Sequence, residues 1–175
     1  MNVSNDSVLG FAGASIALLL QLLAAPVLAI GGSVPNFVIV FVMAYALVRP
    51  QRLGSVMPFV LGLAFDLTSG SPVGSMAFSL LLVSIVVSRL FAALDNDAML
   101  VPLVLLGAGV LVAELIHALF MLAGGVSASL GDALVHVVVP CTVYEFFLGA
   151  AAYLVMRRLV PRQTAAVPTN VSNVR

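Results

Sequence analysis

Long apolar runs separated by short polar segments dominate the chain. A helix rises about 1.5 Å per residue, so a run of about 20 residues crosses a hydrocarbon layer of about 30 Å. The runs predict transmembrane helices at about residues 9–30, 36–49, 53–69, 72–94, 98–123 and 133–156. The second and third are short for a full crossing. We expect an all-α polytopic membrane protein with six helices in one domain over residues 1–162, followed by a disordered cytoplasmic tail over residues 163–175.

The composition supports a membrane location. Of the 175 residues, 62% are hydrophobic and 8% are charged, whereas soluble domains have about 25% charged residues. All basic residues are arginines and the net charge is zero, so no basic patch favours nucleic acid as a partner. The sequence has no nucleophile-elbow, zinc-protease or phosphate-loop motif. We therefore predict a protein that is not an enzyme and has no cofactor or metal.

The arginines predict the orientation in the membrane. Arg49 and Arg52 follow the second helix, Arg89 lies near the end of the fourth, and others follow the sixth. The alternate loops, residues 31–36, 68–71 and 124–132, contain none. The positive-inside rule then places both termini in the cytoplasm.

Ionisable residues inside apolar helices are candidates for function, although many only pair with one another. Glu114 and His117 lie three residues apart and share a helix face, which favours a structural pair over contact with a ligand or partner. Glu145 and Arg89 lie in different helices. They either form an ion pair, or Arg89 reaches the interface and anchors the topology.

Small residues mark the expected contacts between helices. They permit close approach and hydrogen bonding between transmembrane helices. Packing inside the bundle is the favoured interpretation, and docking of a partner helix is the alternative. The pairs are Ser75 and Ser79, Ser84 and Ser88, and Gly109 and Ala113.

Asp66 stands one turn before the predicted end of the third helix, where the helix dipole disfavours a carboxylate. Gly70 suits the left-handed position that ends this helix. Ser71 is then expected to cap the fourth helix, with Pro72 in its first turn. Across so tight a corner, Asp66 is predicted to accept hydrogen bonds from the start of the fourth helix, or from the Ser69 and Ser71 hydroxyls. The alternative is a solvated carboxylate.

Residues 35–90 resemble the MreD family of the bacterial rod-shape machinery. The shared pattern is a proline and an acidic or amide residue that open a short helix, a basic residue at the following turn, and G-x-x-x-D-L-x-x-G-x-x-x-G. In this chain the pattern comprises Pro35, Asn36, Arg49, Gly62, Asp66, Leu67, Gly70 and Gly74. Asn36 stands where aspartate is more often expected.

The resemblance implies a noncatalytic scaffold in the bacterial inner membrane that binds MreC. It also implies association, through MreC or beside it, with MreB, RodA and the class B penicillin-binding transpeptidase. Candidates for structural or partner contacts are Pro35, Asn36, Arg49, Gly62, Asp66, Gly70, Pro72, Gly74, Arg89, Glu114, His117 and Glu145.

A second function stays open at this point. The expected architecture is similar to the six-helix S components of energy-coupling-factor transporters, in which broken helices and polar residues form a ligand pocket. A membrane protein that binds a small vitamin is therefore the alternative, because fold alone does not decide function.

Overall fold

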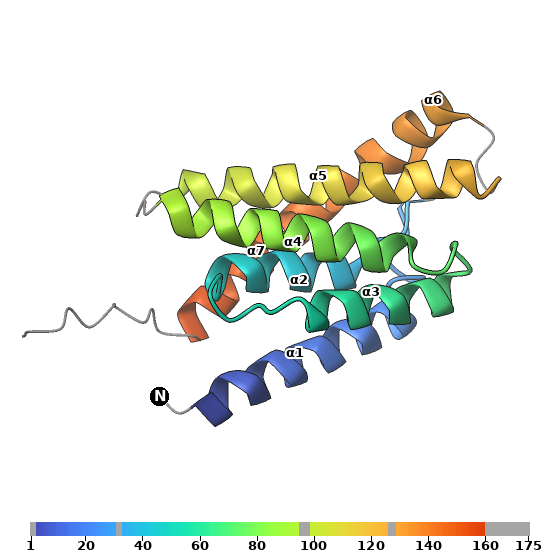
Figure 1. The fold of residues 1–175 in the computed structure, drawn as a ribbon. Coiled ribbons are helices and arrows are strands. Elements are labelled where there is room, and N and C mark those ends of the chain that lie inside the picture. Colours follow the sequence, from blue (N-terminus) through green and yellow to red (C-terminus); the bar gives the residue numbers. More distant parts are fainter. Residues whose placement is uncertain (1–2, 31–32, 95–98, 126–128, 160–175) are drawn as a thin grey trace, which may run out of the picture.

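The computed structural model describes residues 3–30, 33–94, 99–125 and 129–159. This part of the chain is almost wholly helical, and its only extended pairing is one isolated bridge between Ile30 and Ser33. The all-α prediction is confirmed, whereas the tail predicted at 163–175 lies outside the described residues. The helices are α1 (Val3–Leu23), α2 (Phe37–Val48), α3 (Val56–Ser69), α4 (Ser75–Leu94), α5 (Leu100–Ala123), α6 (Leu130–Ala133), the π-helical turn η1 (Leu134–Val138) and α7 (Val139–Leu159) (Figure 1).

Three helical segments are long and apolar enough to cross a membrane: Ser75–Leu94, Leu100–Ala123 and Leu134–Leu159. The other apolar helical segments, Gly10–Leu23, Phe37–Val48 and Val56–Ser69, are shorter. The last long segment joins η1 to α7, where the N–H of Val139 bonds the carbonyl of Leu134. Pro140 follows directly and has no N–H to continue the α-helical ladder, which favours an irregular turn at this point.

Several helix boundaries differ from prediction: the first helix begins at Val3 instead of residue 9, the third begins at Val56 instead of residue 53, and the last helical stretch extends from Leu130 to Leu159 instead of 133–156. Two further differences involve proline. The first helix ends at Leu23 instead of continuing to residue 30, because a proline at 26 cannot donate and its ring clashes with the preceding turn. The fourth helix begins at Ser75 instead of residue 72. Pro72 lies in the turn before it, where its carbonyl accepts the N–H of Ser75 at 3.0 Å.

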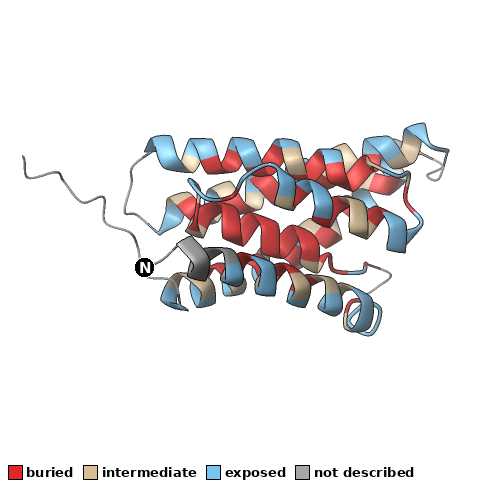
Figure 2. Ribbon diagram, turned by 60° about the horizontal axis from the view of Figure 1, so that its bottom comes forward, coloured by how far each residue is buried: buried red, intermediate tan, exposed pale blue. Residues whose placement is uncertain are grey.

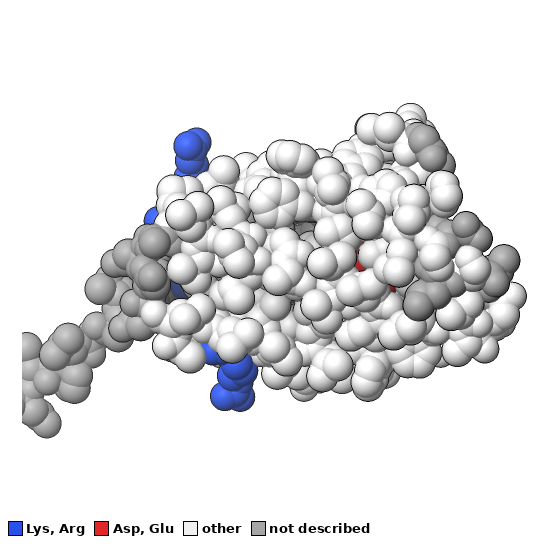
Figure 3. All heavy atoms as spheres, turned by 90° about the horizontal axis from the view of Figure 1, so that it is seen from above, with Lys and Arg blue, Asp and Glu red and all other residues white. Residues whose placement is uncertain are grey.

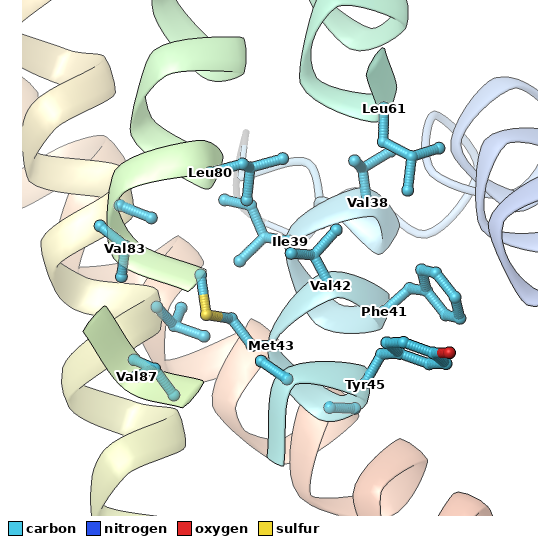
Figure 4. Packing of buried hydrophobic residues seen from close by; sticks show 14 of the residues in the cluster. Val38, Ile39, Phe41, Val42, Met43, Tyr45, Leu61, Leu80, Val83 and Val87 are labelled. Atoms are coloured by element: carbon cyan, nitrogen blue, oxygen red, sulfur yellow. The ribbon is translucent and has the colours of Figure 1, made fainter. Parts of the chain in front are cut away.

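Helix α2 forms the centre of the bundle. All residues from Val38 to Leu47 are buried, and α2 packs against α1, α3, α4, α5 and α7. Figure 2 shows the buried residues concentrated on this central helix and on the inner sides of its neighbours. Ile39 and Met43 face Leu80 and Val83 of α4 in the close view (Figure 4). A helix enclosed on all sides is expected to be apolar all round, as α2 is.

The small residues of α4 and α5 lie at helix contacts inside the bundle, as the favoured interpretation predicted. The α4 serines are buried, as are Gly109 and Ala113 of α5. A Cβ at Gly109 would lie 2.9 Å from a Val87 side-chain carbon and 3.2 Å from the Met43 sulfur. The glycine therefore lets α5 approach both α4 and α2.

The outer surface of the bundle is mostly uncharged. Large apolar side chains are exposed along every long helix. In Figure 3 the basic side chains appear only toward the end where α2, α4 and α7 finish. The described arginines are Arg49, Arg52, Arg89, Arg157 and Arg158.

Candidate functional site

A layer of polar side chains crosses the bundle at the end where α2 and α4 begin. Met43 of α2 packs on Gly109 of α5, and these two helices run in opposite directions (Figure 1). Asn36 lies about two turns before Met43 in α2, and residues 114–117 lie about two turns after Gly109 in α5. Asn36 is therefore at the same level of the bundle as residues 114–117. We call this set the polar layer. It consists of Asn36, Asp66, Ser75, Glu114, His117 and Glu145, all buried except the half-buried His117.

Asp66 joins the end of α3 to the start of α4. Its side chain is only 1% exposed, and it accepts the backbone N–H groups of Gly74 at 2.9 Å, Met76 at 3.0 Å and Ala77 at 3.3 Å. The first N–H groups of a helix have no partner within the helix. A carboxylate there satisfies them and lies at the positive end of the helix dipole. The predicted contact with the next helix is present, and the carboxylate is not solvated.

Two serine hydroxyls complete the surroundings of Asp66. Ser71 donates to its Oδ1 at 2.8 Å and Ser75 donates to the same atom at 3.1 Å. The Ser69 hydroxyl lies 3.0 Å from the Ser71 hydroxyl, so it is connected to the carboxylate only through Ser71. The expectation that Ser71 caps α4 with Pro72 in its first turn was wrong, because the helix begins later and the Ser71 hydroxyl bonds Asp66.

The three glycines of the motif make this corner possible. Gly70 ends α3 with φ of 72°, in the left-handed conformation that the sequence predicted. Gly74 has φ of 97° and brings its N–H to Asp66. At Gly62 a Cβ would lie 2.5 Å from the Cα of Ala77, so only glycine permits this separation of the α3 and α4 backbones. The motif therefore specifies a tight α3–α4 hairpin.

Asn36 caps the start of α2. Its side-chain Oδ1 accepts the N–H groups of Val38 at 3.0 Å and Ile39 at 3.1 Å. The preceding residue, Pro35, is buried and restricts Asn36 little, since it is the residue before a proline that is constrained. Asparagine is among the best N-cap residues, so the amide performs the capping that an aspartate would perform here.

Side chains from two other helices complete the start of α2. Gln21 of α1 accepts the N–H of Phe37 at 2.7 Å. Glu145 of α7 accepts the N–H of Asn36 at 2.9 Å through its Oε1. All the backbone donors at this buried helix start thus have acceptors. Sequence reasoning missed Gln21, for which the available signal was an amide side chain within an apolar helix.

His117 connects the α3–α4 corner to α5. Its Nδ1 lies 3.1 Å from the Ser75 hydroxyl, which also bonds Asp66. Its ring makes an edge contact with Phe65, with centroids 6.1 Å apart. The predicted structural pair of Glu114 with His117 was wrong, because His117 bonds α4 and the described residues contain no ion pair between the two. A shared helix face was not sufficient to bring them together.

Arg89 and Glu145 lie at different levels of the bundle. Glu145 lies level with the first turn of α4, since its partner Asn36 also contacts Met76. Arg89 is exposed and lies 13 residues beyond Met76, about 20 Å along the helix. Of the two alternatives, the structure supports an exposed Arg89 and not an ion pair.

Arg49 lies at the opposite end of α2. It is the residue that ends the helix, and its N–H bonds the carbonyl of Tyr45 at 2.8 Å. Its side chain is 7% exposed. The N–H of Arg52 bonds the Arg49 carbonyl at 2.9 Å, so the basic residue of the motif belongs to the turn between α2 and α3, as predicted.

A comparison with known protein families identifies the family of this chain. The family model described as rod shape-determining protein MreD matches residues 4–162. The chain belongs to the MreD family. It is a rod shape-determining membrane protein, and members of this family are structural proteins of cell shape. No curated protein and no solved structure matches the chain.

Membership of the MreD family favours the first of the two functions that the sequence left open. The α3–α4 hairpin contains the G-x-x-x-D-L-x-x-G-x-x-x-G part of the pattern on which the resemblance rested. Within the described residues, no three His, Cys, Asp or Glu side chains are grouped so that they could hold a metal ion. The chemistry that the described layer provides is helix capping and helix-to-helix hydrogen bonding.

Proposed function

We propose that this protein is a noncatalytic scaffold of the rod-shape complex that binds MreC within the inner membrane. Through MreC or beside it, the protein acts with MreB, RodA and the class B penicillin-binding transpeptidase. The main support is the family match over residues 4–162. A second support is that Asp66 and the motif glycines bond and pack inside the α3–α4 corner. The polar atoms of Asp66 are bonded inside the corner, and large apolar side chains are exposed on its outer side.

This outer side of the α3–α4 corner is the proposed contact with MreC. Leu67 at the end of α3 is 68% exposed, Val73 in the turn is 70% exposed and Phe78 in α4 is 49% exposed. Helices associate in lipid by close van der Waals packing. A corner held rigid by Asp66 presents these side chains in one arrangement, which lowers the ordering cost of binding.

We also propose that all six helices cross the bilayer in an S-component-like bundle. The short α2 fits this proposal because other helices enclose it along its buried length. Local thinning of the bilayer would let so short a helix complete its crossing. Helix α3, with 14 residues, is also short for a full crossing and requires the same local thinning.

The proposed orientation has both termini in the cytoplasm. The described arginines lie toward one end of the bundle (Figure 3), and cytoplasmic loops carry the excess of basic residues. The polar layer then lies near the outer, periplasmic side of the membrane, and so does the α3–α4 corner.

In vivo photo-crosslinking tests the proposed contact. A benzophenone amino acid at Leu67 or Val73 should yield a crosslink to MreC in growing cells. The matched control is Phe147 of α7, which is 67% exposed but lies on another helix of the bundle. Crosslinks to MreC from Phe147 alone would move the interface to α7, and no crosslink from any position would contradict direct binding.

Co-purification tests the function independently of the exact surface. Co-expressed MreC should purify with this protein in mild detergent and raise its thermal stability, because a partner that binds only the folded state stabilises it. A protein that ignores MreC but is stabilised by a vitamin would instead support the transporter-like function.

A further inference from the structure

Glu145 has a carboxylate oxygen that the capping of α2 does not use. Its Oε1 accepts the N–H of Asn36, whereas its Oε2 is buried with no hydrogen-bond partner in the described structure. The whole side chain is 0% exposed. An unpaired buried polar atom is costly, and an unpaired charge in an apolar interior is costlier still. A ligand or a proton at Oε2 would remove this cost.

Glu114 lies on α5, which packs against the α7 helix of Glu145. The Glu114 side chain is 5% exposed. The antiparallel contacts of α5 with α7, Gly107 with Phe146 and Gly149 with Leu106, place Glu114 level with the first turn of α7. An electrostatic interaction accordingly connects Glu114 with Glu145. Two buried carboxyl groups thus lie near enough inside the bundle to interact electrostatically.

No positive side chain in the described structure balances this pair. The described arginines lie toward the opposite end of the bundle (Figure 3). On α5, His117 is bonded to Ser75 and interacts with Asp66. On α3, the Asp66 carboxyl group supplies no positive charge and already has its donors.

The remaining facing groups do not supply a positive charge either. On α7, Cys141 interacts with both glutamates but carries no positive charge. The facing residues of α1, α2 and α4, Gln21, Asn36 and Ser75, do not titrate. His136 of η1 is exposed and lies more than two turns before Glu145 along the chain.

We propose that Glu114 and Glu145 form a proton-binding site and hold one proton in common. The proton lies between a Glu114 oxygen and Glu145 Oε2, so that one carboxyl group donates and the other accepts. Two like charges in a low-dielectric site strongly disfavour each other, and one shared proton removes this repulsion while giving Oε2 a partner. The site connects α5 to α7, and through Asn36 it connects both to the start of α2.

Infrared spectroscopy of the full chain in lipid nanodiscs tests the shared proton directly. At neutral pH the wild-type protein should show the carbonyl absorption of one protonated carboxylic acid, shifted in heavy water. Glu114→Gln and Glu145→Gln should each lose the whole band, whereas the control Asp66→Asn should keep it. Absence of the band in the wild type, or its survival unchanged in either glutamine variant, would overturn the proposal.

The dependence of thermal unfolding on pH provides a second measurement. A folded state that binds more protons than the unfolded state loses stability as the pH rises. The wild-type melting temperature should therefore fall as the pH rises from the range in which unfolded glutamates titrate to the pH at which the folded protein releases the proton, and should level off above it. Glu114→Gln should lack this fall. The glutamine amide donates to Oε2 in place of the proton, so this variant should fold.

A comparison of sodium chloride with choline chloride at equal concentration separates the proton from a metal cation. At fixed pH the two salts should give the same melting temperature. A rise with sodium alone that disappears in Glu145→Gln would overturn the proposal, because the site would then hold a metal cation.

Discussion

The Met76 backbone N–H lies within hydrogen-bond distance of both carboxylate oxygens of Asp66, at 3.0 Å from Oδ1 and 3.1 Å from Oδ2. The carboxylate thus lies over the first turn of α4 although it belongs to the last turns of α3. One side chain thereby replaces the cap that α4 lacks in its own sequence. The resulting corner explains why an apolar chain retains an aspartate at this position.

Replacing Asp66 tests the importance of the corner. Asp66→Ala leaves two buried N–H groups and the part-buried N–H of Gly74 without this acceptor. At about 1–3 kcal/mol for each buried group, we expect a loss of about 3 kcal/mol or more in the free energy of unfolding. Asp66→Asn retains one carbonyl acceptor and should lose less. Complementation of cell shape and thermal unfolding in detergent measure the two effects. Full complementation by Asp66→Ala at normal membrane levels would show that the corner does not matter for function.

Gly62→Ala should separate α3 from α4. The new Cβ would meet the Ala77 backbone at 2.5 Å, and overpacking of this kind costs about 1–3 kcal/mol. Gly131→Ala is the matched control, because nothing lies within 4 Å of a Cβ at that position. Thermal unfolding of both variants checks the prediction. Equal melting temperatures would mean that the hairpin adjusts without cost.

The cap of α2 should contribute measurably to stability. Asn36→Ala removes the acceptor of two N–H groups, and loss of an N-cap side chain costs about 0.5–2 kcal/mol. Asn36→Ser restores a capping oxygen, so its melting temperature should lie near that of the wild type. If alanine and serine are equivalent in thermal unfolding, the cap contributes nothing.

Labelling of single cysteines tests the proposed orientation. In a Cys141→Ala background, cysteines at Ser69 and Ser129 should react with an impermeant maleimide in intact cells. Gln51, which is exposed at the opposite end of the bundle, should react only after permeabilisation. Ser33 and Ser71 are poor reporters because their side chains are buried. Labelling of Gln51 in intact cells would reverse the orientation.

The sequence by itself determined the helical class, the membrane location and the design of the α3–α4 corner. The corner was predictable because its groups are near neighbours along the chain. Asp66 bonds residues only 5 to 11 positions away, and Gly70 must reverse the chain between them. Local steric and dipole rules suffice at such short separations. Even so, the exact start of α4 depended on how Asp66 and Ser71 paired.

Tertiary structure alone decided the partners of the other polar residues. Glu145 bonds Asn36 across 109 residues, and His117 lies against Ser75 across 42. Periodicity indicates which residues share one helix face, but it does not indicate which neighbouring helix that face meets or at what level. The sequence therefore suggested Glu114 for His117 and left Arg89 open as a partner for Glu145. In the structure, His117 instead bonds Ser75, and Glu145 bonds Asn36. These partners follow from the packing of α5 and α7 around the buried α2, because close packing sets the depth at which each side chain meets its neighbours.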